Sequence, residues 1–382
     1  MTDPMLGHTK WRSVIIVNEW RCDWIDKMFV ELRRLQRGDR MTTIFEREIL
    51  SQGEILRQRS DHGARQAEFA AGLWRGRITH VIVAARGSSD NAATLFQYLA
   101  GNELGLLVAL ATPSLYRERC TISMKGAGVL GISQSGQSPD IVQVLHHAGR
   151  EGCPRVAITN DVTSPLALEA EAVLDLLAGE EESVAATKTF SSTWHALAQL
   201  VEAMKGSPLA GLDSLPGVLD VVAPWALSQL IPEQLLGAQQ GLTVVGRGVG
   251  YASATEISLK IREVAGIRSE SYAAPDILHG PIGANGQGAT LLMILTDEVT
   301  DEDASYLLVM AKDSGLSTVV LRPEFRKPLM ADGELVVPVT TSNWAFGLAA
   351  VVVGQVVALR LGESLKRPID NPPGLRKVTR TS

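Results

Sequence analysis

The 382-residue sequence is poor in cysteine, lacks a long uninterrupted apolar run and carries no excess of basic charge. Its three cysteines show no Cys-x-x-Cys spacing and leave an odd one over, which excludes a disulfide framework and a cysteine-based zinc site. The longest apolar stretch, Leu348–Leu361, is interrupted by Gln355 and is too short to cross a bilayer, so we expect a buried helix. The amino terminus also lacks the charge, apolar core and cleavage site of a secretory signal. These absences predict a cytoplasmic protein without a membrane anchor.

Charged residues are nearly balanced, with 36 Lys and Arg against 42 Asp and Glu, for a net charge of −6. A slightly acidic chain is not expected to have nucleic acid as its main partner. No pair of histidines has metal-ligand spacing with a carboxylate partner, so neither a catalytic metal nor a cofactor is expected. The length suffices for two or three domains, each with its own core.

The first forty residues differ in composition from the rest of the chain. They hold three of the seven tryptophans and four arginines between Arg33 and Arg40. Met41 then opens a segment with a capping threonine, an early glutamate and apolar residues at helical spacing. We expect Met41 to be the functional start and residues 1–40 to be an upstream reading or an adaptor arm. A translated but idle segment is the plainer alternative.

Short apolar runs alternate with amphipathic stretches from residue 78 onward. Helices are expected near 90–101, 138–150 and 187–205. Strands are expected at Thr79–Ala84, Gly128–Ser133, Arg155–Thr159 and Val173–Leu177. Such an alternation is typical of right-handed βαβ units and of a parallel sheet covered on both faces.

The same scheme starts again after Ser207–Leu236, a strand-poor segment that we expect to be a helical bridge. Thr243–Gly250 echoes Val81–Ser89, and apolar runs follow at 291–295, 317–321 and 335–339. Two copies of one α/β unit are therefore predicted, as a pseudo-two-fold pair. The expected divisions are an arm with a leading helix (1–62), a first unit (63–206), a bridge (207–240), a second unit (241–365) and a tail (366–382).

The segment Gly131–Asp140 is a candidate phosphate site. It follows an expected strand, begins an expected helix, and contains Ser133, Gln134, Ser135 and Ser138. Hydroxyl, amide and backbone N–H donors at a helix N-terminus suit a phosphate, even without a lysine or arginine in the loop. A serine-rich helix cap without a ligand is the alternative, although the donors are denser than a cap requires.

Two further turns of small residues belong to the same unit. Arg86–Ser89 ends its first strand, and Val184–Thr189 precedes another helix. Ligands of open α/β sheets bind beyond the carboxyl ends of the strands, so Ser88 and Ser89 are expected to face the same site as Ser133. A dinucleotide site is not favoured, because no glycine turn forms a Gly-x-Gly-x-x-Gly motif followed by a ribose-binding acid.

Glu256, Lys260 and Glu263 share one face of an expected helix in the second unit. A surface ion-pair ladder is the ordinary explanation for this spacing. Here the remaining faces carry apolar residues such as Ile257 and Val264, which predicts a buried helix. A buried carboxylate beside a lysine can be tuned to act as a general base.

Two features near the end of the chain could complete a site. His279 precedes Gly280 and Pro281, a fixed turn that can hold its ring toward a ligand, although lone histidines are more often structural. The final residues form a basic tail that includes Lys377. Such a tail is either a frayed terminus or a segment that closes over an anionic sugar.

These motifs occur in an order that resembles the sugar isomerase (SIS) domain family. The order runs from Arg-Gly-Ser-Ser at 86–89 and Ser-Gln-Ser-Gly at 133–136 to Val-Ala-x-Thr-Lys at 184–188. The Glu/Lys helix, His279-Gly-Pro and a tail with Lys377 follow. From residue 41 onward the sequence is similar to the isomerase half of glucosamine-6-phosphate synthase and to stand-alone SIS-type glucosamine-6-phosphate deaminases. The resemblance implies an α/β fold of two tandem SIS units, each a flavodoxin-like parallel sheet between helices.

The resemblance also implies a role for each matched residue. Glu263 would shuttle a proton between C1 and C2, Lys260 would steady the developing enolate, and Lys377 would engage the open-chain carbonyl. His279 would assist ring opening in the site of the other subunit of a homodimer. The residues expected to bind the phosphosugar are Ser88, Ser89, Ser133, Gln134, Ser135, Ser138, Val184 and Glu256.

Three positions depart from the synthase pattern. Thr2 stands where a glutaminase domain has its nucleophilic cysteine, Ala186 replaces a serine, and Leu278 replaces a lysine. We therefore expect no glutaminase domain, and release of ammonia in preference to its capture. The function predicted is conversion of glucosamine 6-phosphate into fructose 6-phosphate and ammonia.

Two alternatives remain open. One is an isomerase or deaminase for another sugar phosphate, such as galactosamine 6-phosphate. The other is a phosphosugar-sensing regulator, a class that carries an N-terminal helix-turn-helix unit. Residues 1–62 offer too few helices for such a unit, and a sensor would not need Glu263, His279 and Lys377 together, so an enzyme is favoured.

Overall fold

The structure is a computed structural model that describes residues 43–116, 120–238, 240–284, 288–297 and 299–377. All of these residues belong to one compact unit, Thr42–Ser382. The arm expected at residues 1–40 and the start expected at Met41 lie outside the described residues. Of the cysteines in the described part, Cys120 and Cys153 are free thiols.

The first sheet contains five parallel strands in the order β2-β1-β3-β4-β5. The strands are β1 (His80–Ala84), β2 (Leu107–Leu110), β3 (Ala127–Ile132), β4 (Arg155–Thr159) and β5 (Ala172–Asp175). The connecting helices are α3 (Ser88–Leu104), η2 (Pro113–Leu115), α4 (Pro139–Arg150), α5 (Pro165–Glu169) and, after the last strand, α6 (Lys188–Lys205). This strand order is that of the flavodoxin-like doubly wound fold.

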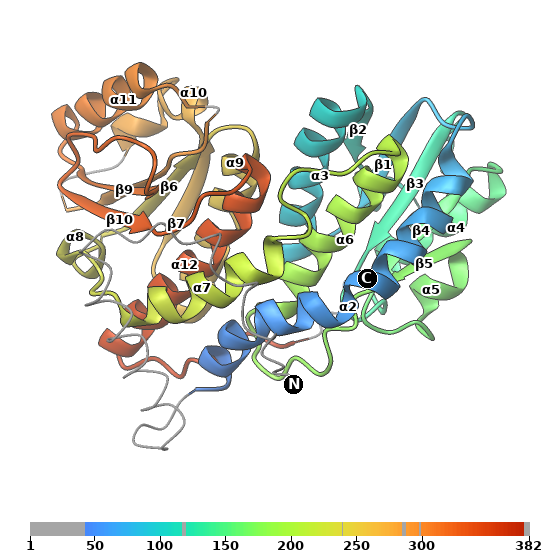
Figure 1. The fold of residues 1–382 in the computed structure, drawn as a ribbon, viewed down its shortest axis with the longest axis horizontal. Coiled ribbons are helices and arrows are strands. Elements are labelled where there is room, and N and C mark those ends of the chain that lie inside the picture. The colour runs from blue at the N-terminus through green and yellow to red at the C-terminus, as the bar shows by residue number, and fades with distance from the viewer. Residues whose placement is uncertain (1–42, 117–119, 239, 285–287, 298, 378–382) are drawn as a thin grey trace, which may run out of the picture. The chain divides into compact units, whose positions relative to one another are not determined.

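The second sheet repeats that topology with the order β10-β9-β8-β6-β7, again all parallel. Its strands are β6 (Leu242–Gly246), β7 (Ser269–Ala273), β8 (Thr290–Ile294), β9 (Ser317–Pro323) and β10 (Gly333–Val337). Its helical segments are α9 (Val249–Lys260), η3 (Ile261–Ala265), α10 (Ala274–Ile277), η4 (Pro281–Ala284), α11 (Asp301–Asp313) and α12 (Asn343–Ser364). The prediction of two tandem parallel-sheet units flanked by helices is confirmed (Figure 1).

A long helix precedes the first sheet and a helical bridge precedes the second. The leading helix is α2 (Ile44–Trp74), which begins as expected, since Thr43 Oγ1 accepts a hydrogen bond from the Glu46 N–H at 3.1 Å. The helix is continuous to Trp74, so the division expected at residue 62 falls inside it. The bridge contains α7 (Leu215–Ser228) and α8 (Glu233–Leu236), as the strand-poor sequence indicated. In each half, the helix that comes before the sheet packs against the helix that follows its last strand. These pairs are α2 with α6 and α7 with α12.

The apolar stretch near the end of the chain forms the core helix α12. By length and composition this helix could cross a membrane, but 94% of its apolar window is buried inside the protein. Close packing against α9 depends on Gly354, where a Cβ atom would lie 2.4 Å from Cγ1 of Ile257. The buried helix predicted from Leu348–Leu361 is confirmed, and it fixes the position of the helix that carries Glu256 and Lys260.

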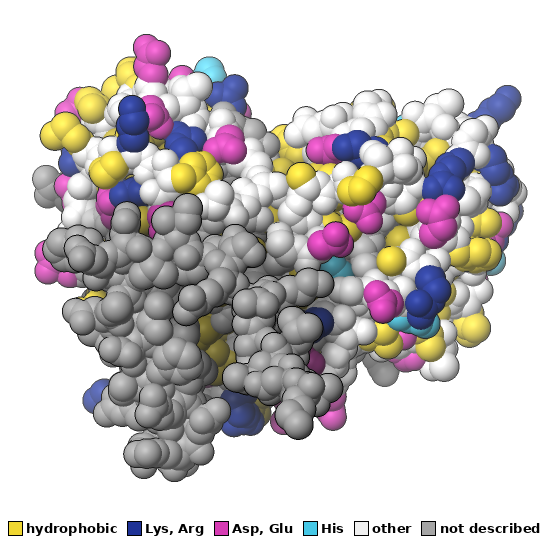
Figure 2. All heavy atoms as spheres, viewed as in Figure 1, with side chains coloured by type: hydrophobic (Ala, Val, Ile, Leu, Met, Phe, Trp, Pro, Cys, Tyr) yellow, Lys and Arg dark blue, Asp and Glu magenta, His cyan; other side chains and the backbone are white. Residues whose placement is uncertain are grey.

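One face of the molecule mixes charges of both signs among the described residues (Figure 2). On the face shown in Figure 2, basic and acidic side chains are interspersed over both sheet units, with apolar side chains scattered among them. The even charge balance of the sequence is therefore also a local property of this face.

Candidate active site

Three loops at the carboxyl edge of the first sheet line a pocket of about 1150 Å³. They connect β1 to α3, β3 to α4, and β5 to α6, and the opposite wall comes from α9, η3 and the C-terminal tail. β1 and β3 are the neighbouring strands at which the strand order reverses, which is where doubly wound folds bind ligands. The phosphosugar-binding residues expected from sequence line this pocket together, with the exception of Glu256.

The loop after β3 presents several hydrogen-bond donors to the pocket. Ser138 precedes α4, yet its side chain makes no capping bond to that helix and lies 3.4 Å from Ser133 Oγ. Ser135 Oγ accepts from the Gln137 N–H at 3.3 Å. A hydroxyl that is not used in capping is available to a ligand, so the alternative of a simple serine cap loses support.

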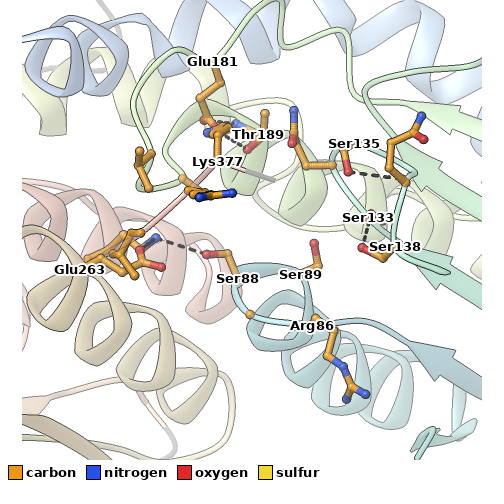
Figure 3. A pocket seen from close by; sticks show the side chains of 18 of the residues that line it. Arg86, Ser88, Ser89, Ser133, Ser135, Ser138, Glu181, Thr189, Glu263 and Lys377 are labelled. Carbon is orange, nitrogen blue, oxygen red and sulfur yellow. Dashed lines mark hydrogen bonds and ion pairs between the residues drawn. The ribbon is translucent and has the colours of Figure 1, made fainter. Parts of the chain in front are cut away.

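This loop depends on one glycine. Gly136 has φ of +61°, and a Cβ atom there would lie 2.0 Å from Oγ of Ser164. A side chain would therefore meet both backbone strain and a clash. The tight turn directs Ser135 and Ser138 to the same side, as Figure 3 shows.

The turn after β1 adds the second pair of serines. It reverses at Gly87, with φ of 56° and ψ of −131°, and Ser88 and Ser89 begin α3. The Arg86 side chain leads away from these hydroxyls and forms an ion pair with Asp140 at 2.9 Å (Figure 3). The serines, not the arginine, therefore provide the donors at the centre of the site.

Glu256, Lys260 and Glu263 form one connected acid–base cluster. Lys260 has no exposed surface, lies 3.3 Å from a Glu256 oxygen and pairs with Glu263. Its Nζ is also 3.3 Å from Ser88 Oγ, which links the cluster to the first unit. Glu263 retains 23% exposure and lies in η3, a π-helical turn, which is a conformation common at functional sites. The surface ion-pair ladder is excluded for this helix.

The electrostatics keep Lys260 charged. Burial opposes its ammonium form, but the carboxylates of Glu256 and Glu263 outweigh this effect and raise the pKa of Lys260 above its usual range. Glu256 is fully buried and accepts hydrogen bonds from Ser88 (3.0 Å) and Asn91 (2.7 Å). Both of its oxygens are therefore occupied by protein groups. Glu256 holds Ser88 and Lys260 in place and does not line the pocket, unlike the ligand contact expected from sequence.

The C-terminal tail forms the remaining wall through Gly374, Leu375, Arg376 and Lys377. Lys377 pairs with the buried carboxylate of Glu181 and donates to the Ser183 carbonyl at 2.7 Å. Although burial opposes it, Lys377 together with the hydroxyl and N–H of Thr189 holds the pKa of Glu181 below its usual range. The tail lysine thus lies in the site, as the resemblance implied.

Sequence reasoning did not name Glu181 or Thr189 as site residues. The role expected of His279, in the site of another subunit, stays a prediction. Glu181 stands in a run of three glutamates that has the look of a solvated loop, and only its spacing before Val184 pointed to the site. His279 is exposed between α10 and η4 and does not line the pocket of its own chain.

The loops at the carboxyl edge of the second sheet differ in charge from those of the first. Gly248 before α9 has nearly the same backbone angles as Gly87, φ 56° and ψ −128°. The loop after β8, however, leads into α11, whose first turn is acidic. Arg326 donates to the carbonyls of Thr296 and Val299 in this loop, each at 2.9 Å. An acidic helix start repels phosphate. Among the described residues, only the first sheet therefore has loops suited to bind phosphate at this edge.

The arrangement provides what an aldose–ketose proton transfer requires. Figure 3 shows Ser133, Ser135 and Ser138 on one side of the pocket and Glu263 with Lys377 on the other. Neutral donors at a helix N-terminus can hold a phosphate. A partly exposed carboxylate can move a proton, and the charged lysine beside it can stabilise the oxyanion that results.

Comparison with known proteins gives sequence relatives and solved structures. A family model for the SIS domain matches residues 77–203, the span that holds all three loops. The chain is 29% identical over 316 residues to the glutamine–fructose-6-phosphate aminotransferase (isomerizing) of Methanosarcina mazei, which covers 79% of this chain and 51% of that enzyme. The chain therefore spans about half the length of the curated relatives that it matches.

Solved structures match over nearly the whole fold. A Silicibacter pomeroyi protein described as a phosphosugar isomerase is 30% identical, with a TM-score of 0.75 over 86% of this chain and 99% of that one. The glucosamine-6-phosphate deaminase of Thermotoga maritima shares the fold at 19% identity, with a TM-score of 0.69 over 89% of this chain and 100% of the other. The repeated sheet topology, the serine loops and these similarities lead to one conclusion: the chain belongs to the SIS-domain family.

Proposed function

We propose that the protein is an enzyme that isomerises and deaminates an amino-sugar phosphate, with glucosamine 6-phosphate as its substrate. The observation that carries this proposal is a single pocket lined by the Ser133–Ser138 loop and by Lys260 and Glu263. A phosphate anchor sets the position of the sugar carbons relative to the acid–base cluster, and a proton transfer between neighbouring carbons needs such positioning. The similarity to an aminotransferase that acts on fructose 6-phosphate supports an amino sugar as substrate.

The proposed reaction starts with opening of the sugar ring to the aldehyde. Glu263 takes the proton from C2 and delivers it to C1, while Lys260 stabilises the charge that develops on the C1 oxygen. As the C2 amine becomes an imine, the C1 oxygen takes up the proton that the nitrogen loses. Water then adds to the imine carbon, ammonia leaves, and the sugar product is fructose 6-phosphate. Lys377 contacts the open-chain carbonyl from the tail, and its place in the wall of the pocket supports this role.

The resemblance assigns ring opening to His279 and not to a group that lines the pocket of the same chain. His279 is exposed and lies outside that pocket. We therefore propose that the protein acts as a homodimer, in which His279 of one protomer completes the site of its partner.

The test is ammonia release and fructose 6-phosphate formation by the purified chain supplied with glucosamine 6-phosphate. Galactosamine 6-phosphate, and fructose 6-phosphate with glutamine, are run in parallel. Glu263→Gln removes the base and is expected to lower kcat by about 10²–10⁴-fold. Glu54→Gln changes an exposed carboxylate of α2 outside the pocket and should have full activity.

Equal amounts of ammonia and fructose 6-phosphate from the gluco substrate would support the proposal. Full turnover by Glu263→Gln would refute the assignment of the base. Activity with the galacto sugar alone would keep the mechanism and change the substrate. Tight binding of sugar phosphates without turnover of any of them would instead favour a sensor.

A further inference from the structure

The C-terminal tail is fixed to the fold at a point outside the pocket, through Asp370. Its carboxylate accepts hydrogen bonds from the N–H groups of Ile44 at 3.0 Å and Phe45 at 2.9 Å. These are the first residues of α2, more than 300 positions earlier in the sequence. A helix start has N–H groups without intrahelical partners and a partial positive charge, so a carboxylate is a strong acceptor partner there.

The same residue also contacts the wall of the pocket. The Asp370 carbonyl accepts a hydrogen bond from the Val184 N–H at 3.2 Å, and Val184 lines the pocket. Asp370 therefore joins three segments: α2, the loop between β5 and α6, and the tail.

The tail between Asp370 and Lys377 spans the pocket between two fixed points. Gly374–Lys377 line the cavity, and Lys377 is held by Glu181 and the Ser183 carbonyl. A short segment tied at both ends has few conformations, so Lys377 is held at the pocket before a substrate arrives. Without the Asp370 contact, that ordering would have to be supplied on binding.

We propose that Asp370 is a positioning residue, which fixes the tail to the start of α2 and thereby holds Lys377 in the site. Its importance for catalysis rests on the proposed function. Its importance for the position of Lys377 does not, because that can be measured without turnover.

The test compares Asp370→Ala and Asp370→Asn with Thr43→Ala. Thr43 caps the same end of α2, through the Glu46 N–H, whereas Asp370 accepts from the N–H groups of Ile44 and Phe45. Thr43→Ala is thus a matched control for helix capping. Asparagine keeps one acceptor oxygen and is a good capping residue, so Asp370→Asn should recover part of the loss.

The first readout is the rate at which an amine-specific acylating reagent modifies Lys377, measured by peptide mass spectrometry against the exposed Lys327 as internal reference. We expect faster modification of Lys377 in Asp370→Ala, an intermediate rate in Asp370→Asn and the wild-type rate in Thr43→Ala. Circular dichroism checks that each variant is folded. An unchanged Lys377 rate in folded Asp370→Ala would overturn the proposal.

The second readout is a double-mutant cycle on turnover with Lys377→Ala. Asp370→Ala alone should lower kcat/KM by about 10- to 100-fold, the loss expected from misplacing a site group. In the Lys377→Ala background it should have almost no further effect, because its influence passes through that lysine. Independent, multiplicative losses would refute positioning. If the wild type has no activity, the proposed function fails, while the modification rates still decide the role of Asp370.

Discussion

Lys260 shows how a single residue can indicate function by its energetic cost. A lysine with no exposed surface between two carboxylates loses most of its hydration. The attraction within a buried ion pair often only offsets that penalty, and well-packed apolar residues of similar size can be equally stable or more so. A stable fold therefore does not require this cluster. Its position at the pocket supports a chemical role.

A second buried cation, Arg59, has a different environment. Its guanidinium donates to Nδ1 of His195 and to Gln199 Oε1, each at 2.8 Å. Since an arginine has no acceptor, Nδ1 must carry the lone pair and His195 must be neutral. Burial, with Arg59 as a second cause, lowers the pKa of His195 to about 3.

This histidine predicts a sensitivity of stability to acid. In the unfolded chain His195 takes up a proton near its ordinary pKa, whereas in the folded protein it does so only near pH 3. The unfolded state therefore binds more protons between these values, and stability falls as the pH decreases through that window. The contribution of this group approaches about 1.4 kcal/mol per pH unit.

His195→Gln keeps an acceptor for Arg59 and removes the titration. We expect urea midpoints of the wild type to fall more steeply than those of the variant between about pH 6.5 and about pH 4. The difference between the two slopes isolates His195 from other groups that titrate in the range. Parallel slopes would show that the ring is protonated in the fold.

At the scale of elements, the strands that sequence reasoning found are those with buried faces. β1, β3, β4 and β5 were predicted within two residues, because each is a short apolar run. β2 (Leu107–Leu110) and β7 (Ser269–Ala273) were missed. Both lie at a sheet edge next to the first strand of their unit and are partly exposed. β7 (Ser-Glu-Ser-Tyr-Ala) contains no apolar run, whereas β2 (Leu-Val-Ala-Leu) is apolar but has only four residues and begins shortly after the end of α3.

Loop geometry gives a second prediction at this scale. Gly136→Ala places a methyl group at φ +61° and against Ser164, whereas Gly152→Ala meets a similar φ of +71° with nothing within 4 Å. Each should lose about 1–2 kcal/mol of unfolding free energy from the backbone conformation. Only Gly136→Ala should lose more, and only it should raise KM for the sugar phosphate. Urea denaturation and steady-state kinetics measure the two effects, and equal behaviour of the two variants would contradict the role assigned to the loop.

At the scale of the whole molecule, the site depends on contact between the two units. α3 follows the first strand of one unit and α9 follows the first strand of the other, and the two helices pack together. Ser88 on α3 contacts Glu256 and Lys260, which belong to α9. Sequence motifs predicted each unit and most of its site residues. They could not predict that both Glu256 oxygens accept hydrogen bonds from the first unit, because these bonds depend on how α3 and α9 pack together.

The contact between α9 and α12 leads to a prediction that links stability to turnover. Gly354→Val inserts a side chain where a Cβ atom alone would be 2.4 Å from Ile257, so α9 must shift away from α12. We expect a loss of about 1–3 kcal/mol of stability and a lower kcat, because Lys260 moves with the helix. Gly217→Ala in α7 has nothing within 4 Å of the new Cβ and should stabilise by about 1 kcal/mol with kcat unchanged. A stability loss in Gly354→Val with undiminished kcat would show that the cluster tolerates movement of α9.

The Arg326 side chain marks how the two sheet units differ at the carboxyl edge of their strands. The two sheet units have equivalent glycine turns, at Gly87 and Gly248, but they offer different groups beyond those turns. The first unit presents serine hydroxyls, whereas in the second Arg326 donates to the carbonyls of the loop after β8 and the helix after the turn carries Lys260. Under the proposed function, the first unit binds the phosphate and the second unit supplies the proton transfer, so that neither unit could act without the other.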